Sequence, residues 1–329
     1  KASSQTPLTS MRIMELFYTE GGFPKGVVNL VTCSRVEADI LLTDERVKAV
    51  TFVGTTGVGK QVYSKAAAHG KRVQAQCEAK NHALVLEDCN LEATVNAIIN
   101  STYGCAGMRC MALPVVCVQE SIADEFVSLL KKKAEVMKLG CAYDEETDLG
   151  PVVNAGHKEK ICNWIQKGID EGAELVLDGR NVAVPGYENG FFVGPTILDH
   201  VTPEMTVGNR EIFGPVTCIK RVKDYEEGIK IMNANPFANG SCIFTQSGYY
   251  SRKFAMETDG GMVGINVGIP VPTAYFPFSG NKDSFFGDLH VLGKDGYRFF
   301  TRAKTVTTHW FDEAAGKRKV GTWEGSTEA

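Results

Sequence analysis

The sequence predicts an α/β protein in which a parallel sheet is covered by helices on both of its faces. Candidate strands alternate with candidate helices along the chain, and the strands, such as Ala49–Val53, are continuous apolar runs. Strands that are buried on both faces have this composition. With 329 residues, the chain is long enough for two domains or for one large α/β unit with an ample core.

The first run of elements begins with a helix over residues 8–21, because its apolar residues recur at helical spacing and Gly21-Gly22 ends it. Apolar runs and turn formers predict the next elements in the same way. They are a strand at 27–32, helices at 35–43 and about 57–69, and strands at 49–53 and 72–77.

A second run of strands and helices follows Asn81, predicted from the same two periodicities. The helices are expected at 91–103, 121–138, 156–171, 225–234 and 248–258. The strands are expected at 82–86, 114–118, 175–177, 191–193, 216–222, 243–245 and 263–267.

The segment 286–311 departs from this alternation. A short amphipathic piece leads into Ala303–Thr308, which is strongly β-forming and has no local partner. Such a strand usually completes a sheet elsewhere, so we expect it to pair in a neighbouring subunit of a homo-oligomer, a dimer or a tetramer. The polar stretch 314–329 is expected to be a mobile tail.

Composition excludes several classes of partner. The formal net charge of −4 comes from evenly mixed acidic and basic residues, so we expect no nucleic-acid partner. No apolar run approaches the roughly 20 residues of a membrane helix, so no membrane partner is expected. The ten cysteines are scattered and lack metal-ligand spacing, which indicates a reducing compartment and no metal site. Because the first residue is Lys1, we expect the chain to continue a longer protein.

The stretch Gly104–Met111, GCAGMRCM, is the candidate reactive site. A reactive thiol needs a lowered pKa or a nearby base, together with backbone donors for the oxyanion it creates. Asn90 is a plausible cap of the helix before this stretch, and the small residues after the helix let a substrate approach the main chain. Arg109 beside Cys110 favours the thiolate and can hold an anionic group. The alternative is a buried, inert cysteine followed by a surface arginine.

Two further features are candidates for cofactor binding. The turn Gly54–Gly59 follows a strand and opens a helix, whose N-terminal amides favour phosphate, although an ordinary strand–helix turn would look the same. In the EIFGPV stretch, Glu211 precedes an aromatic residue and a rigid Gly-Pro corner. Its carboxylate can bind a ribose diol, or it can be a solvated side chain at a loop edge. We interpret His82 as a structural residue with its hydrogen bonds satisfied.

The order of these motifs resembles that of the NAD-dependent aldehyde dehydrogenase superfamily. The motifs are KASSQTP at the start, FVGTTGVG, GCAGMRC, EIFGPV and RAKTVTTHWF. Four others resemble one coenzyme-A-acylating branch, the methylmalonate-semialdehyde dehydrogenases: AKNH at 79–82, AGMRCMA at 106–112, GYENG at 186–190 and GIPVP at 268–272. The resemblance covers about residues 1–311.

This resemblance implies the aldehyde dehydrogenase fold and a division of the chain into three parts. Residues 1–80 would be the C-terminal half of a partial, Rossmann-like NAD-binding domain, and 81–285 the catalytic domain. Residues 286–329 would return to the NAD side and supply an oligomerisation strand. The family also implies a location in the mitochondrial matrix.

The implied reaction oxidises methylmalonate or malonate semialdehyde with NAD and coenzyme A, and yields propionyl-CoA or acetyl-CoA. Cys110 matches the nucleophile that attacks the aldehyde and later carries the thioester. Arg109 matches the position that holds the carboxylate of the small-molecule semialdehyde.

The resemblance also implies the residues that bind NAD. Lys1 falls where the family holds the adenosine ribose, Gly54 and Thr55 lie at the turn near the pyrophosphate, and Glu211 falls at the nicotinamide ribose. Phe213 would pack beside the nicotinamide.

Two pairs of residues depart from the family pattern in this cofactor region. Ser4-Gln5 stands in place of an acidic-basic pair that helps to bind the cofactor. Cys77-Glu78 stands in place of a Gly-Gly pair that lets the backbone pass close to it.

The identity of the acyl acceptor is inferred from the absence of a catalytic glutamate. Hydrolytic relatives carry a glutamate that activates water, and we place Ala75 at that position. A thiol ionises more readily than water and needs less help from a base, so Ala75 favours coenzyme A as the acceptor. Glu78 is a possible substitute base. Two alternatives stay open: a hydrolytic aldehyde dehydrogenase, and a non-catalytic scaffold derived from a truncated dehydrogenase.

Overall fold

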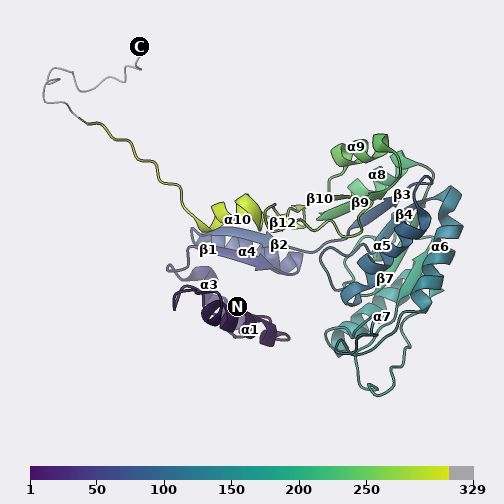
Figure 1. Ribbon diagram of the computed structural model, residues 1–329, viewed down its shortest axis with the longest axis horizontal. Coiled ribbons are helices and arrows are strands. Elements are labelled where there is room, and N and C mark those ends of the chain that lie inside the picture. The colour runs from purple at the N-terminus through teal and green to yellow at the C-terminus, as the bar shows by residue number, and fades with distance from the viewer. Residues whose placement is uncertain (311–329) are drawn as a thin grey trace, which may run out of the picture.

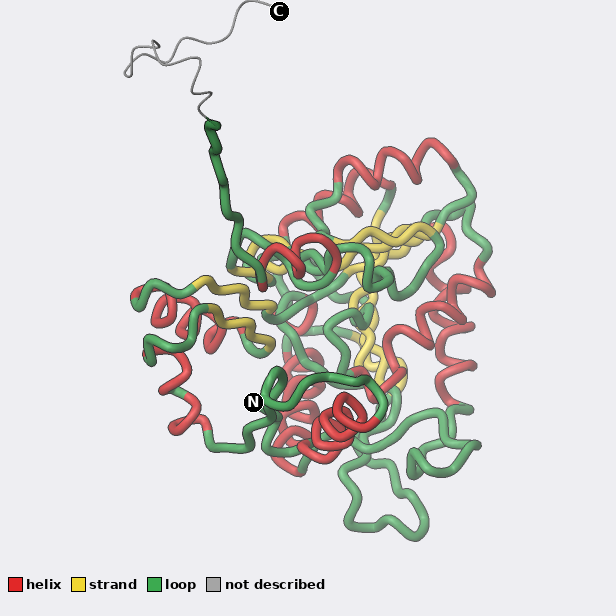
Figure 2. The backbone as a smooth tube through the Cα atoms, turned by 60° about the vertical axis from the view of Figure 1, so that its left-hand side comes forward, coloured by secondary structure: helices red, strands yellow, loops and turns green. Residues whose placement is uncertain are grey.

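The computed structural model describes residues 1–310, so the predicted tail at 314–329 lies outside the described residues. Two sheets organise the chain (Figure 1): a seven-stranded sheet within the larger lobe and a three-stranded sheet within a smaller one. The N-terminal helices and the last described residues lie on the side of the smaller lobe, away from the large sheet (Figures 1 and 2).

The seven-stranded sheet has the order β10-β9-β3-β4-β7-β6-β5. All neighbouring strands pair in parallel except β5 and β6, which are antiparallel. Its strands are β3 (His82–Val85), β4 (Val115–Gln119), β5 (Glu174–Leu177), β6 (Thr196–Asp199), β7 (Val216–Val222), β9 (Gly240–Phe244) and β10 (Met262–Ile265).

Helices cover both faces of this sheet, as the sequence predicts. One face packs against α5 (Leu91–Tyr103), α6 (Glu120–Glu135) and α7 (Ala155–Asp170), and this side contains the larger apolar cluster. The other face packs against α8 (Tyr225–Ala234) and α9 (Gly248–Glu257). The central strands are therefore buried on both sides, which is why Ala83–Val85 of β3 and Val115–Val118 of β4 are continuous apolar runs.

The smaller sheet joins two distant parts of the chain. β1 (Ala49–Val53) and β2 (Arg72–Gln76) are parallel, and β12 (Phe285–Phe286) adds to β2 in the antiparallel direction. Helix α4 (Thr56–Ala68) connects β1 to β2 and packs against β2. β8 (Phe237–Ala238) pairs in the antiparallel direction with β11 (Asn281–Lys282). In the returning chain, β11 comes just before β12.

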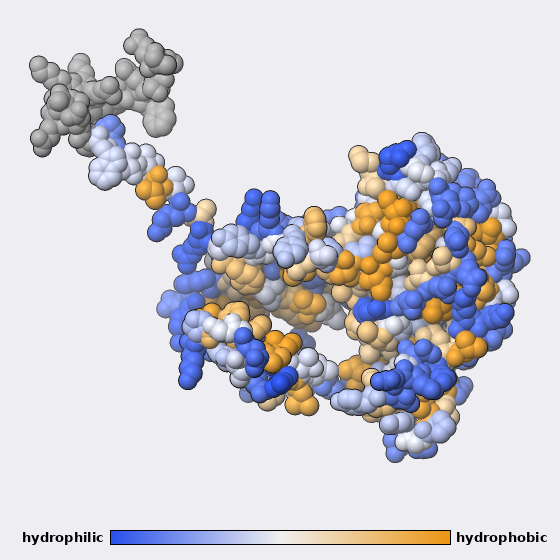
Figure 3. Space-filling model, in the orientation of Figure 1, coloured by the Kyte–Doolittle hydropathy of each residue, from blue (hydrophilic) through white to orange (hydrophobic). Residues whose placement is uncertain are grey.

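Short elements complete the fold. Helix α1 (Pro7–Thr19) contains no buried residue, and its apolar side chains Leu8 and Met11 are exposed. Hydrophobic surface is visible over the N-terminal part of the chain in Figure 3. The remaining helices are α2 (Arg35–Ala38), α3 (Ile40–Thr43), α10 (Gly293–Phe300) and the 3-10 turns η1 (Gly104–Gly107) and η2 (Thr206–Gly208).

Several predicted elements differ from the structure. The strand predicted at 27–32 is wrong, because no described strand lies beside this segment and its one ladder-like bond is Ala2 N–H to the Val31 carbonyl. The strand predicted at 191–193 is also wrong: Pro195 follows it, and the strand at the sheet is β6. The helix at 35–43 is two single-turn helices, α2 and α3.

The predicted strand Ala303–Thr308 is exposed and has no strand assignment within the described residues. A single chain offers no sheet edge beside it, so its pairing with a second subunit stays a prediction. The division of the chain at residues 80 and 285 also stays a prediction.

We predict that Phe126→Ala lowers the free energy of unfolding by about 3–5 kcal/mol. Phe126 lies on α6, is fully buried in the larger apolar cluster, and leaves a cavity when truncated. Chemical denaturation measures the effect. Tyr143→Ala is the control, because Tyr143 is 98% exposed, and an equal loss in both variants would contradict the assignment of Phe126 to the core.

Candidate active site

Cys110 follows helix α5 through a left-handed turn. The Asn90 side chain caps α5 by accepting a hydrogen bond of 3.0 Å from Ala93 N–H, as expected from the sequence. At the other end of α5, Cys105 and Ala106 adopt φ values of 53° and 54°. This backbone conformation is costly for residues with a Cβ atom and is typical of functional sites.

Gly107 brings this turn against a second loop. Its φ is +68°, and a Cβ atom at this position would lie 2.1 Å from the carbonyl oxygen of Gly214. Only glycine allows this contact. The loop Glu211–Pro215 therefore lies directly against the cysteine turn, although the two are about a hundred residues apart in the sequence.

Two asparagine amides hold the backbone of Cys110. Asn81 Nδ2 donates to the Cys110 carbonyl at 2.9 Å and to the Ala112 carbonyl at 2.8 Å. Asn239 Nδ2 donates to the same Cys110 carbonyl at 3.0 Å. These bonds orient the Cys110 backbone from the residue before β3 and from the residue before β9.

Four of the predicted site residues meet in one cavity. Cys110, Arg109, Glu211 and Phe213 line it together. The sequence places Arg109 beside Cys110, but only the fold brings Glu211 and Phe213 to the same place. Cys110 thus lines a cavity together with three other predicted site residues, and its part as a reactive thiol stays a prediction.

Burial raises the pKa of the Cys110 thiol above its ordinary value. The Glu211 carboxylate raises this pKa further, whereas the Arg109 guanidinium lowers it. The sequence-based expectation that Arg109 favours the thiolate has the correct direction, but burial outweighs it. The thiol is therefore protonated at neutral pH when no ligand is bound.

Glu211 has an unusual titration for a carboxyl group. Burial, with a smaller contribution from the Glu78 charge, raises the pKa of Glu211 to about 7. The hydrogen bond of 3.0 Å from Ala79 N–H to Oε1 acts in the opposite direction. Glu211 therefore gains its negative charge near neutral pH, inside the cavity that contains the thiol.

The Arg109 guanidinium is partly engaged by α5. Its Nη2 donates to the carbonyl oxygens of Asn100 and Ser101, the latter at 3.1 Å. Among the described residues, the buried Nε of Arg109 has no hydrogen-bond partner. A buried guanidinium N–H without a partner is costly, and an anion is the partner that it binds most strongly.

The residue of β2 that is linked to the Cys110 backbone is Gln76, through Asn239, whereas Ala75 lies on the opposite face of the strand. Ala75 points toward α4, where its Cβ lies 3.8 Å from a Cβ built on Gly59. Gln76 Nε2 donates at 2.7 Å to Asn239 Oδ1, and Asn239 in turn holds the Cys110 carbonyl. Alternate residues of a strand point to opposite faces, which is why one step along β2 changes the assignment. Neither side chain is a carboxylate.

A carboxylate of the same chain binds the turn after β1. Thr55 is the N-cap residue of α4, it is exposed, and its side chain makes no capping bond. Instead, Glu78 Oε2 accepts a hydrogen bond of 2.9 Å from Thr56 N–H at the N-terminus of the helix. Gly54 N–H donates to the Gln76 carbonyl at 3.1 Å, which fixes the turn against β2.

Cys77 packs beneath α4 and does not face the cavity. Its Sγ lies 2.3 Å from a Cβ built on Gly59, and burial raises the pKa of its thiol to about 11. Lys1, Ser4 and Gln5 are exposed in the segment before α1. The bonds in that segment are local: Lys1 Nζ donates to the Ala2 carbonyl at 2.9 Å.

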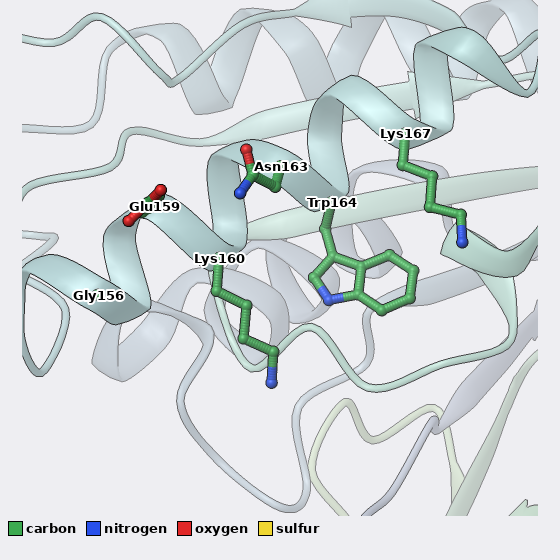
Figure 4. A pocket seen from close by; sticks show the side chains of 6 residues that line it. All are labelled: Gly156, Glu159, Lys160, Asn163, Trp164 and Lys167. Carbon is green, nitrogen blue, oxygen red and sulfur yellow. The ribbon is translucent and has the colours of Figure 1, made fainter.

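A second hollow follows one face of α7 (Figure 4). Lys160, Trp164 and Lys167 point to the same side of the helix there, and Lys167 Nζ lies 5.3 Å from the centroid of the Trp164 ring. The positive charge of Lys160 lowers the pKa of Glu211. His157 Nε2 donates to the Phe213 carbonyl at 2.7 Å and ties α7 to the active-site loop.

Sequence reasoning missed the amide network of Gln76, Asn81 and Asn239. Asn81 lies in the AKNH motif, whereas no local pattern distinguishes Asn239. The interpretation of His82 is half correct: Nδ1 bonds to the Lys80 carbonyl at 2.7 Å, but the buried Nε2 has no partner in the described part of the chain. Burial lowers the pKa values of His82 and Lys80.

We predict that alkylation of Cys110 by iodoacetamide is slow at neutral pH. Its rate should rise about tenfold per pH unit, and should keep rising above the pH at which an ordinary thiol is already ionised. The reason is that only the thiolate reacts and burial raises the thiol pKa. Peptide mass spectrometry of timed samples measures the rate for this cysteine alone. A Cys105→Ser variant controls for the exposed neighbour, and a rate that levels off near neutrality would contradict the burial.

Glu211→Gln is predicted to stabilise the protein by about 1–3 kcal/mol near pH 8 and to have little effect near pH 5. Since the pKa is about 7 in the folded chain and lower in the unfolded chain, the native state loses stability as pH rises between these two values. Denaturation of both proteins at the two pH values tests this. A gain that is the same at both would exclude the carboxyl charge as its cause.

Curated relatives resemble nearly the whole chain. Malonate-semialdehyde dehydrogenase 1 of Oceanobacillus iheyensis is 47% identical over 311 residues, which cover 94% of this chain and 64% of the relative. Malonate-semialdehyde dehydrogenase 2 of Bacillus mycoides is 49% identical over 310 residues, with the same shares. The chain thus spans less than two thirds of the length of these relatives.

Solved structures agree. The crystal structure of methylmalonate-semialdehyde dehydrogenase from Oceanimonas doudoroffii matches with a TM-score of 0.92 and 43% identity, over 95% of this chain and 64% of that one. A putative methylmalonate-semialdehyde dehydrogenase from Sinorhizobium meliloti, complexed with NAD, gives a TM-score of 0.92 and 41% identity, over 94% of this chain and 63% of that one.

These comparisons correct one expectation. The similar curated relatives are bacterial proteins, and they point away from a mitochondrial matrix location, so that prediction is wrong. Within residues 1–310, no helix is long and apolar enough to cross a membrane, and no group of three or more potential ligands is placed to hold a metal ion.

The family model covers most of the chain. The model of the aldehyde dehydrogenase family matches residues 1–306, which include the cysteine turn, the Glu211 loop and helix α4. The arrangement of sheets and helices is that of the aldehyde dehydrogenase fold. This chain belongs to the aldehyde dehydrogenase family.

Proposed function

We propose that the protein oxidises a small semialdehyde that carries a carboxylate, malonate or methylmalonate semialdehyde, and transfers the acyl group to coenzyme A. The observation that carries this proposal is the cavity in which the Cys110 thiol lies with Glu211 and Arg109. The names of the similar bacterial relatives support the substrate class.

Cys110 would act as the nucleophile. Its sulfur forms a bond to the aldehyde carbon as the carbonyl π bond breaks, and the thiol proton passes to the resulting oxyanion, which becomes a hydroxyl. Loss of that hydroxyl proton and of a hydride from the same carbon leaves a thioester on Cys110. The nicotinamide of NAD, when bound, supplies the acceptor for the hydride. The thiol of coenzyme A then attacks the thioester and releases the Cys110 thiolate.

Arg109 would bind the substrate carboxylate. Its buried Nε has no partner among the described residues, and guanidinium N–H groups form strong, directional bonds to carboxylates. The carboxylate would place the aldehyde carbon beside Cys110, the next residue. In the substrates proposed, loss of this carboxylate as carbon dioxide yields acetyl-CoA or propionyl-CoA.

The choice of coenzyme A over water rests on the base position. Gln76 on β2 is linked to the Cys110 backbone through Asn239 and cannot accept a proton from water, and the side chain of Ala75 on the opposite face carries no polar atom. The thiol of coenzyme A ionises far more readily than water and needs less assistance. A hydrolytic aldehyde dehydrogenase is the alternative within the family, and free acid formed without coenzyme A would select it.

The nicotinamide end of NAD fits the residues present. Glu211 would accept hydrogen bonds from the ribose diol once it is ionised, above its pKa of about 7. Phe213 lines the same cavity beside it. Lys160 would add positive charge from α7, and the α4 turn with Gly54 and Thr55 would face the pyrophosphate. The structure related to this one that contains NAD supports this choice of cofactor.

The other parts of the cofactor are less well matched. Lys1, Ser4 and Gln5 would lie toward the adenosine, but they are exposed and bonded locally. Glu78 occupies the first free amide of α4, with Cys77 packed behind it. This carboxylate favours a second candidate function, a scaffold that no longer binds NAD.

We also propose that the protein forms a homo-oligomer, a dimer or a tetramer. The segment 302–310 is extended and exposed over its described length. Its β-forming sequence suits addition to a sheet edge of another subunit.

We predict that Cys110→Ala abolishes the formation of NADH from malonate semialdehyde and leaves the affinity for NAD nearly unchanged, because it removes one buried sulfur atom and no cofactor ligand. Absorbance of NADH and calorimetric titration measure the two properties. Cys105→Ala is the matched control and should keep the activity. Undiminished reduction in Cys110→Ala would show that this thiol is not the nucleophile, and no NAD binding by the unmodified protein would select the scaffold.

A further inference from the structure

The N-terminus of α4 carries a carboxylate of the chain itself. Glu78 Oε2 accepts a hydrogen bond of 2.9 Å from Thr56 N–H, and Thr56 Oγ1 accepts one of 3.3 Å from Glu78 N–H. Thr56 is buried, with 8% of its surface exposed. The first free amide of a helix of thirteen residues is thus already bonded to an anion.

The returning C-terminal segment holds Glu78 in this position. Ser284 Oγ donates to the Glu78 carbonyl at 2.7 Å, and Cys77 N–H donates to the Ser284 carbonyl at 2.8 Å. Thr56 Oγ1 also donates to the Asp283 carbonyl at 3.1 Å. Backbone and helix are therefore fixed from both sides, and the Glu78 side chain is the part that can rotate.

Glu78 lies between the two places where a dinucleotide would be held. Its carboxylate is bonded to the start of α4, and its charge raises the pKa of Glu211 in the thiol cavity. Among residues 1–310, Lys60 forms an ion pair with Asp283 at 3.1 Å, whereas Glu78 forms none with a lysine or arginine. A second anion at the same amide would meet an uncompensated like charge.

We propose that Glu78 is a built-in competitor for the phosphate-binding end of α4, so that a dinucleotide binds only after the Glu78 carboxylate has left Thr56 N–H. This inference rests on the proposed use of NAD. The amide and the positive end of the helix dipole attract either anion, and one excludes the other. The affinity of the chain for NAD is accordingly weaker than its other site residues would give.

The test is calorimetric titration of the full chain and three variants with NAD and, separately, with inorganic pyrophosphate. Glu78→Gln keeps the size of the side chain and an oxygen that accepts the Thr56 bond, and removes the charge. Glu78→Gly removes the side chain altogether. Glu45→Gln is the matched control, because Glu45 is an exposed glutamate in the turn before β1.

Both Glu78 variants are expected to bind NAD about tenfold more tightly or better than the unmodified chain, with Glu78→Gly the tighter of the two. Pyrophosphate should follow the same order, and Glu45→Gln should match the unmodified chain. Thermal denaturation checks that the variants are folded, and a small loss of stability in Glu78→Gly is expected from the loss of the helix cap.

The two proposals fail in distinguishable ways. If all four proteins bind NAD with equal affinity, Glu78 is not a competitor and the proposed NAD-dependent function stands. If none of the folded proteins binds NAD or pyrophosphate, removal of Glu78 has uncovered no site. Both the competitor and the proposed use of NAD are then overturned.

Discussion

The contact between Gly107 and the carbonyl of Gly214 is the constraint on which the rest of the site depends. It requires a residue without Cβ in a left-handed conformation, and it brings two loops together that are far apart in the sequence. Because of it, the Cys110 turn and the Glu211 loop share one cavity. The large sheet supplies the rigid base, since Asn81, just before β3, and Asn239, just before β9, both hold the Cys110 carbonyl.

The cost of this arrangement is electrostatic. A thiol and a carboxyl group are buried together, so both have raised pKa values and both are protonated more readily than in water. Arg109 compensates only in part, because its Nη2 is bonded to the end of α5. Arg109 thus keeps one N–H group that could bind an anion. The carboxyl groups of Glu211 and Glu78, in contrast, repel each other when both are ionised.

Much of the fold could be predicted from the sequence, because hydrophobic periodicity determines it. The helix 91–103 and the strands 49–53 and 216–222 have the predicted bounds, since each is a clear amphipathic or buried run. The segment 27–32 has the same β-forming composition but no neighbour, and strand formation depends on pairing as much as on composition. Strands of two residues, such as β11 and β12, carry no periodic signal at all.

The candidate site was predictable only in its reactive residues. Cys110, Arg109 and Glu211 stand in recognisable motifs. The bond from Asn239 to the Cys110 carbonyl, in contrast, depends on where the fold places the start of β9, far from Cys110 in the sequence. The choice between Ala75 and Gln76 turned on which face of β2 meets the cysteine, and a shift of one residue reverses that face. The bond from Glu78 to α4 depends on the rotamer of one side chain, which no spacing rule specifies.

The central claim is that the sulfur of Cys110 carries the acyl group between oxidation and transfer. Mass spectrometry of the protein after incubation with malonate semialdehyde and NAD, with coenzyme A withheld, tests it most directly. The account predicts an acyl adduct on the peptide that contains Cys110, which disappears when coenzyme A is added. An adduct confined to another cysteine, or NADH formed with no adduct on any cysteine, would contradict it.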